Sequence, residues 1–230
     1  MVVRWSRQAP TQILALRDEL TSREFDDPDL WWPQHPGVLG GRDRTAGGTW
    51  CACSVTSGVT ALVLNRPQQR IAEPGAPSRG VLPLIGVEQE MAWLSDFDVS
   101  GMASFMLVLA MPDRLVAWVY DGQTLVSTEH VPGTHMFTSG GAEDGKADRY
   151  LHAFEQATFP DGWRGLVERE PPVDDPAALV VRHEQGDAAF ATVFGQLIEA
   201  MPGQLRVEYS RQPWTADPWT AKHWDSTAPE

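Results

Sequence analysis

A cation and two carboxylates, Arg17, Asp18 and Glu19, directly follow an apolar run at residues 13–16. That run predicts a β-strand, and side chains alternate along a strand, so Arg17 and Glu19 are expected on one face and Asp18 on the other. On spacing alone, such a charge run is typical of a solvated strand end. The competing interpretation is a functional site, because a buried Arg needs a carboxylate paired with it.

The only two cysteines of the chain, Cys51 and Cys53, are two residues apart. On a strand this spacing places both thiols on one face, but two soft ligands fall short of the four that a structural zinc site uses. The two are also poorly placed for a disulfide with each other, which favours a reducing cytoplasm. We predict that both are small buried core residues.

The six histidines are scattered along the chain, and none has the spacing of metal ligands on a helix face. His130 and His135 flank Pro132-Gly133 and are expected to share a loop. A haem or metal role for either is the less favoured interpretation, because imidazole serves many other purposes. We therefore predict no metal site.

Composition and charge exclude several classes of function. Hydrophobic residues make up 42% of the chain and charged residues 21%, which is enough for a sizeable core. The formal net charge of −13 argues against partners that need a basic face, namely nucleic acids and anionic membrane surfaces. No apolar run approaches the roughly 20 residues of a membrane helix, and no signal peptide is visible. The ten tryptophans indicate core anchors or, alternatively, an aromatic ligand pocket.

The elements expected to position the candidate residues are mainly strands. Alternating and β-branched segments predict strands at residues 2–5, 12–16, 104–110, 115–120, 124–128, 190–198 and 204–209. Residues 49–65 predict a hairpin that turns at Ser57-Gly58. Apolar spacings of three and four predict helices at residues 84–94 and 145–159, and residues 161–167 predict a further short helix.

Segments rich in Pro and Gly are predicted to be loops. They are residues 26–36, the stretch bracketed by Gly40-Gly41 and Gly47-Gly48, and residues 66–83 and 171–176. Residues 211–230 form a tail rich in Trp and Pro, which we expect to lie extended on a single domain of residues 1–210 and to fray at its end. Helices in the middle of the chain with strands on both sides indicate an α+β fold.

Six segments, taken together, resemble the NRDE family, also called the transport and Golgi organisation family. They are "ILALRDELTSRE", "WWP", "VLGGRDRTAGGTWCACS", "GVTALVLNRP", "SRG" and "ATVFGQLIEA", and the resemblance runs from about residue 13 to residue 209. It implies a fold like that of the N-terminal nucleophile hydrolases. In that fold, a four-layer αββα sandwich, two antiparallel sheets face each other and helices cover the outside.

The resemblance also implies a set of site residues. Related hydrolases use an Arg and an Asp in this region to hold the nucleophile and its amine, so Arg17 and Asp18 are the leading candidates. The family's Asn-Arg-Asp-Glu tetrad begins with Leu16 here, so its Asn is absent. Asn65 is a weaker candidate for a polar wall of the site. The candidate ligand-binding residues are Trp32, Trp50, Arg66 and His135.

The chain departs from the family pattern at its start. Members usually begin Met-Cys, and the Cys thiol is the nucleophile with its own α-amino group as the base. This chain begins Met1-Val2-Val3, and neither Cys51 nor Cys53 has a free amine beside it. Either the protein lacks the nucleophile and is a binding module, or its true start lies a few residues upstream and supplies a Cys.

Two functions of different classes are therefore expected. For the chain as it stands, the first is the binding or trafficking of a small hydrophobic ligand, with haem as a possible cargo, because the family has been linked to haem trafficking. The alternative is a cysteine N-terminal nucleophile amidohydrolase or acyltransferase that acts on a small amide. Neither function involves nucleic acid or membrane insertion, and no pattern indicates an oligomeric state. Abundant Trp, Pro and Asp with little Lys is typical of a bacterium with GC-rich DNA.

Overall fold

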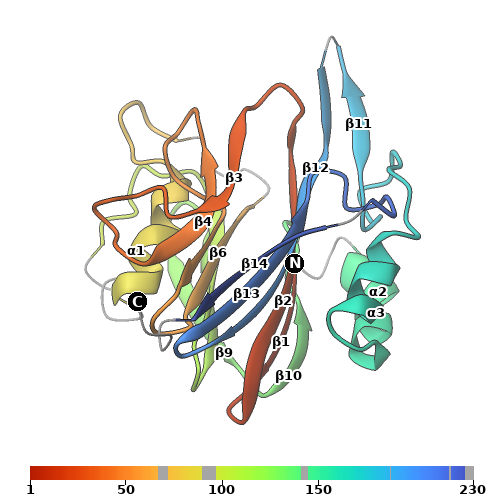
Figure 1. The fold of residues 1–230 in the computed structure, drawn as a ribbon. Helices are drawn as coiled ribbons and strands as arrows, with labels where there is room; N and C mark the ends of the chain where they lie inside the picture. The colour runs from red at the N-terminus through yellow and green to blue at the C-terminus, as the bar shows by residue number, and fades with distance from the viewer. Residues whose placement is uncertain (67–71, 90–96, 141–144, 187, 218, 226–230) are drawn as a thin grey trace.

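Two antiparallel β-sheets face each other in the computed structural model, which describes residues 1–66, 72–89, 97–140, 145–186, 188–217 and 219–225 (Figure 1). The first sheet has the order β10-β1-β2-β12-β13-β14, with β11 paired to β12. Its strands are β1 (Val2–Ser6), β2 (Ala9–Leu20), β10 (Gly133–Met136), β11 (Arg182–Gln185), β12 (Ala188–Met201), β13 (Gln204–Ser210) and β14 (Thr220–Asp225).

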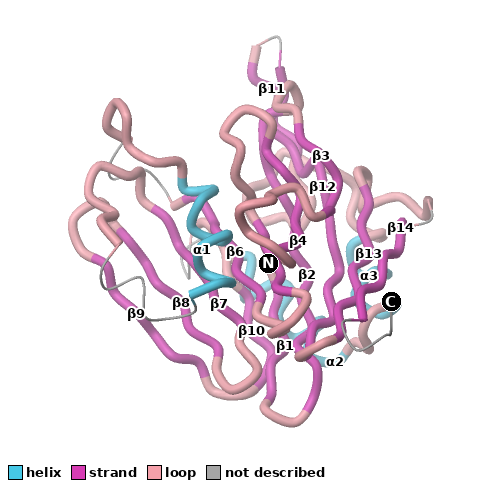
Figure 2. Tube along the Cα trace, turned by 60° about the vertical axis from the view of Figure 1, so that its left-hand side comes forward, coloured by secondary structure: helices cyan, strands magenta, loops and turns pink. Residues whose placement is uncertain are grey.

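The second sheet follows the order of the chain from β3 to β9. Its strands are β3 (Phe25–Asp29), β4 (Val38–Asp43), β5 (Cys51–Ser54), β6 (Thr60–Asn65), β7 (Phe105–Ala110), β8 (Leu115–Tyr120) and β9 (Leu125–His130). Figure 2 shows β7, β8 and β9 on the side of the molecule away from β13 and β14. The two sheets thus form the two inner layers of the fold.

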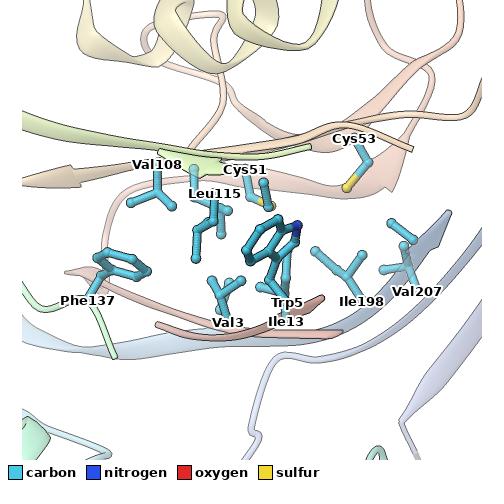
Figure 3. Close-up of a cluster of buried hydrophobic side chains, with 14 of the residues drawn as sticks. Val3, Trp5, Ile13, Cys51, Cys53, Val108, Leu115, Phe137, Ile198 and Val207 are labelled. Carbon is cyan, nitrogen blue, oxygen red and sulfur yellow. The ribbon is translucent and has the colours of Figure 1, made fainter. Parts of the chain in front are cut away.

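Alternating side chains of both sheets form the core between them. From the first sheet, Trp5, Ile13 and Ile198 point toward the second, from which Cys51 and Val108 point back (Figure 3). Because neighbouring residues on a strand point to opposite faces, Leu14 and Leu197 face the outer side of the first sheet. This alternation is what allows each sheet to pack on two sides.

Helices cover the two outer faces. The 3₁₀-helix η1 (Arg79–Val81) leads into α1 (Leu82–Gln89), which packs on the second sheet through Leu84 and Val87. On the other side of the molecule, α2 (Lys146–Gln156) and α3 (Asp161–Val167) cover the first sheet through Phe154 and Trp163. The predicted α+β fold, a four-layer αββα sandwich, is therefore confirmed.

Most strands that the apolar pattern predicts are present, including the hairpin of β5 and β6, whose turn contains Ser57-Gly58. The predicted loops at 26–36 and 40–48 are partly wrong, because β3 and β4 run through them and pair with each other. Pro28 is tolerated because β3 lies at the edge of its sheet. Gly40 and Gly41 belong to β4, where a side chain would collide with the main chain at Cys51 and with the ring of Trp50.

Four further expectations need correction or qualification. The strand predicted to end at residue 16 continues to residue 20, since β2 pairs with β12 as far as Leu20. The predicted loop around Pro132-Gly133 contains β10, in which His135 pairs with Val3 of β1. The helix predicted at 84–94 is present as α1, and residues 90–94 lie outside the described residues. In the tail, β14 pairs with β13, and residues 226–230 lie outside the described part.

Candidate functional site

A cavity of about 550 Å³ opens where the first residue of the chain meets β2. One wall is the segment 14–19 of β2, and the other walls include residues 136–140, which begin with the last residue of β10, the end of β6 and residues 78–80 at the start of η1. In the register of the first sheet, Val2 of β1 lies opposite Leu14, so β1 does not extend alongside residues 15–20. The cavity therefore lies along the edge of β2 that β1 leaves uncovered.

Met1 is fixed at this place by main-chain bonds to the neighbouring strand. Its α-amino nitrogen donates to the carbonyl oxygen of Phe137 at 2.8 Å, and the Phe137 N–H donates to the Met1 carbonyl oxygen at 2.9 Å. Both residues line the cavity. The first residue of this chain is thus part of the cavity wall.

Arg17 points between the sheets and is only 6% exposed, so the solvated strand end expected from spacing alone is wrong. Its guanidinium stacks on two rings, 4.5 Å from the centroid of Trp50 and 5.0 Å from that of Phe25. Its Nη2 lies 3.2 Å from Oδ2 of Asp43 and 3.5 Å from Oε2 of Glu19. Burial is the main influence on the guanidinium and lowers the pKa of Arg17, while the two carboxylates oppose that shift.

Asp43 contacts several of the residues around Arg17. Arg17, Glu19, Arg23, Asp43 and Trp50 are here called the corner. Its Oδ2 accepts from Nε of Arg23 at 2.6 Å, and its Oδ1 accepts from the backbone N–H groups of Thr45 and Ala46 at 3.0 and 2.9 Å. Burial by itself raises the pKa of Asp43, but the bonds from Arg23 and Ala46 and the charges of Arg23 and Arg17 outweigh it, so the pKa lies below its ordinary value. The carboxylate therefore stays ionised.

Two glycines of β4 make room for the ring on which Arg17 stacks. A Cβ atom on Gly41 would lie 2.4 Å from the indole of Trp50, and one on Gly40 would lie 2.5 Å from the carbonyl oxygen of Cys51. The segment "GGRD" thus has a physical explanation. Its glycines admit Trp50 and the chain that follows it, and its Asp43 holds Arg17.

Two hydrogen-bond donors in this corner have no acceptor among the described residues. They are Nη1 of Arg17 and Nε1 of Trp50, both buried and both on side chains that line the cavity. A buried donor without an acceptor costs about 1–3 kcal/mol. An acceptor reaches these two fully covered atoms only if the surrounding side chains move.

Asp18 lines the same cavity from the other face of β2, as strand alternation predicts. Its Oδ1 accepts from Oγ1 of Thr192 at 2.6 Å, next to an irregularity in β12 between Thr192 and Phe194. Thr192 Oγ1 also accepts from the Val181 N–H at 3.0 Å. Arg17 and Asp18 therefore contribute to one cavity although their side chains leave β2 in opposite directions.

The other residues predicted for the site fall into two groups. Asn65, Arg66 and Trp50 line the cavity. Trp32 does not: it is buried beneath the outer face of the second sheet and donates through Nε1 to the Gly47 carbonyl oxygen at 2.8 Å. His135 also lies outside the lining, with its Nε2 2.8 Å from the carbonyl oxygen of Val131.

Sequence reasoning missed several residues that line the cavity, among them Asp43, Arg79 and His183. The segments "GGRD" and "SRG" contain the first two, so their agreement with the family pattern was an available signal. For His183 no local signal exists, because β11 brings it to the cavity from late in the chain.

Cys51 and Cys53 are buried between the sheets with 1% and 2% exposure, which confirms that they are core residues. Burial, followed by the neighbouring Cys53, raises the pKa of the Cys51 thiol well above its ordinary value. A thiol that stays protonated is a poor nucleophile. Neither cysteine lines the cavity.

Comparisons with known proteins agree with this architecture. A search of the curated proteins gave no match. Two similar solved structures are a cysteine-to-alanine mutant and an arginine-to-leucine variant of conjugated bile acid hydrolase from Clostridium perfringens. They are 11% and 10% identical, with TM-scores of 0.56 and 0.55, and each alignment covers 97% of this chain and 91% of the other. At this identity the likeness shows the fold alone, which is N-terminal nucleophile hydrolase-like.

The described helices are all too short or too polar to cross a membrane.

The sequence family described as Transport and Golgi organisation 2 matches residues 4–164, which is more than half of the chain and includes most of the segments that line the cavity. This protein therefore belongs to the Transport and Golgi organisation 2 family.

Proposed function

We propose that the protein binds a small amphipathic molecule in the cavity at the uncovered edge of β2. The observation that carries this proposal is the cavity itself. Its volume of about 550 Å³ lies within the range typical of small-molecule sites, roughly 300–1,000 Å³. Apolar and charged side chains both line it, which suits a ligand with a hydrocarbon part and a polar end.

The apolar part of the lining, here called the apolar wall, consists of Leu14, Leu16, Met136 and Leu179, which also belong to the cluster on the outer face of the first sheet. Across the edge of β2 lie charged side chains of the lining, among them Arg17 and Arg79. A ligand that spans the edge would bury hydrocarbon on one side and place acceptor atoms on the other.

A neutral apolar dye such as Nile red tests this proposal directly. Leu16→Trp would place a bulky ring in the cavity and is expected to weaken dye binding by about tenfold or more. Leu30→Trp is the matched control, because Leu30 is 50% exposed and does not line the cavity. Equal dye affinity in the two variants, measured by fluorescence titration, would contradict the proposal.

Haem is one cargo of this class. Among the described lining residues, His183 and Met136 carry side chains that can ligate iron, whereas His135 lies outside the lining. A titration with haem that gives a Soret shift, lost in His183→Ala and kept in His135→Ala, would support haem as the cargo. A shift lost only in His135→Ala would place the haem elsewhere on the molecule.

A second candidate function, acyl transfer from an N-terminal cysteine, is favoured by the position of Met1. This residue lines the same cavity as Arg17 and Asp18, the pair that related hydrolases use around the nucleophile and its amine. A thiolate at the place of Met1 would attack an acyl carbonyl, and the leaving group would depart with a proton from the α-amine.

This candidate is tested with a chain in which cysteine, exposed by removal of a preceding initiator Met, takes the place of Met1. A p-nitrophenyl acyl ester should then acylate the thiol and release p-nitrophenolate, with the mass of the acyl group added to the protein. The unaltered chain and the same cysteine variant carrying Arg17→Met are the controls. Acylation that is equal with and without Arg17 would argue against a catalytic use of this corner.

A further inference from the structure

The cavity is basic although the protein is strongly acidic. Its described lining includes five cationic side chains and three carboxylates, in a chain with a formal net charge of −13. The cations are Arg17, Arg23, Arg66, Arg79 and Lys146, and the carboxylates are those of Asp18, Glu19 and Asp43. This local excess of positive charge favours an anionic ligand.

Two of the carboxylates are already paired. Glu19 and Asp43 both contact Arg17, at 3.5 and 3.2 Å, and both contact Arg23, at 3.7 and 2.6 Å. These four side chains form a network of ion pairs. The remaining arginines make no ion pair with its carboxylates, although the charge of Glu19 acts on Arg79 from a greater distance.

Arg66 and Arg79 are those remaining arginines, here called the basic wall. Within the described part of the chain, neither makes an ion pair with a carboxylate. Nη1 of Arg79 donates to the Ser104 carbonyl oxygen at 2.9 Å, and the backbone N–H of Arg66 points to the same oxygen at 3.4 Å. Nη1 of Arg66 donates to the Ser139 carbonyl oxygen at 3.1 Å.

Each guanidinium of the basic wall keeps donors available. Arg has five N–H donors in a planar fork that matches a carboxylate, and each of these two guanidinium groups makes one hydrogen bond to a described residue. Burial is the main influence on Arg79 and lowers its pKa, with Glu19 opposing that shift. A partly buried cation that contacts no carboxylate is unfavourable, so an incoming carboxylate would gain both a charged partner and the free N–H donors.

We infer that the ligand is an amphipathic monocarboxylate, whose carboxylate pairs with Arg79 and Arg66 while its hydrocarbon part lies along the apolar wall. This inference rests on the proposed function and adds the chemical class of the ligand. Lys146 is the competing cation in the lining, but it lies at the start of α2, on the outer side of the first sheet, where Asp18 also faces the cavity.

The test compares decanoate with decanamide, which has the same length but no charge, by isothermal titration calorimetry at neutral pH. The unaltered protein should bind decanoate about tenfold to a hundredfold more tightly, as expected for a charge-assisted hydrogen bond. Arg79→Gln should remove this preference by weakening decanoate alone, with decanamide affinity unchanged. Circular dichroism would show that the variant is folded.

Two control variants locate the effect. Lys146→Gln changes a cation of the same cavity, and Arg114→Gln changes a cation that is not in the lining. Both should keep the preference for decanoate. If the preference is lost in Lys146→Gln and kept in Arg79→Gln, the assignment of the carboxylate to the basic wall is overturned.

The outcomes also separate this inference from the proposed function. Equal affinities for decanoate and decanamide would overturn the inference and leave binding in the cavity intact. Binding of Nile red together with no binding of either decanoyl compound would do the same. If neither Nile red nor the decanoyl compounds bind, both the inference and the proposed function are overturned.

Discussion

Arg17 and Arg79 line the same cavity but are held in opposite ways. Arg17 lies against two aromatic rings and contacts two carboxylates, whereas Arg79 makes its hydrogen bond to a backbone carbonyl and has no ion pair among the described residues. The comparison shows that two arginines of one cavity can differ in role. Arg17, whose charge is paired, stabilises the structure around the site, whereas Arg79, which has no ion pair among the described residues, can pair with a charged ligand.

Removing the two charges should separate the two roles most clearly. Among the described residues, Arg17→Met leaves Glu19 and Asp43 with Arg23 as their only ion-pair partner, and breaking a buried ion pair of this kind costs about 3–5 kcal/mol. Arg79→Met removes no ion pair among the described residues and should cost about 1 kcal/mol or less. Urea unfolding of both variants checks the difference, and equal losses would contradict it.

Crowding the ring beneath Arg17 should have a somewhat smaller effect. Gly41→Ala places a Cβ atom 2.4 Å from the Trp50 indole, so the ring must move, at a cost of about 1–3 kcal/mol. Gly165→Ala, within α3, is the control, because a Cβ atom there meets nothing within 4 Å and Ala favours a helix. Thermal unfolding should show a loss for the first variant only; a tolerated Gly41→Ala would mean that Trp50 is not fixed in place.

The loss of folding stability at acidic pH compares the buried carboxylate of Asp43 with an exposed one, and the expected difference is smaller. Because the pKa of Asp43 in the folded protein lies below its ordinary value, its contribution is present above the unfolded pKa of about 3.9 and is lost as pH falls through the folded pKa. Asp43→Asn should therefore lower stability at neutral pH and flatten the loss below about pH 4. Urea unfolding at neutral pH checks the first effect, and Asp113→Asn, at a surface side chain that is 64% exposed, should cost about 1 kcal/mol or less there.

The smallest effect is expected for alkylation of the two cysteine thiols in the folded protein. Both cysteines are buried, and burial raises the pKa of Cys51, so iodoacetamide at about pH 8 should not modify the folded protein. In denaturant both should react. Rapid alkylation of the folded protein, followed by mass spectrometry, would show that the space between the sheets opens more readily than the packing indicates.

Much of the fold could be predicted because its strands carry their own signal. The hairpin of β5 and β6 has arms rich in small apolar and β-branched residues and a Ser-Gly turn, and the strands β7 and β8 are apolar throughout. The strands β3 and β4 could not, since Pro28 and the pair Gly40-Gly41 are signals for loops. They form strands because of pairing and close packing between distant segments, which local pattern does not contain.

The site was predictable where the family pattern and the strand coincide, as at Arg17 and Asp18. Trp32 and Trp50 show that residue type alone did not predict which side chains line the cavity. Both looked like ligand-binding aromatics, but one lies on the outer face of the second sheet and the other beside the cavity. Residue type alone does not say which face of a sheet a segment reaches. Arg79 needed the same information, because its position depends on how η1 meets the segment before β5, where the Thr49 N–H donates to the Gly80 carbonyl oxygen.

The central claim is that ligands bind at the edge of β2 that β1 leaves uncovered. Hydrogen exchange measured by mass spectrometry, with and without saturating decanoate, tests it most directly. We expect slower exchange of the backbone amides at residues 15–19 and 137–140, and no change in the edge strand β9, which does not line the cavity. Protection confined to β9 or to any other surface, with residues 15–19 unaffected, would contradict it.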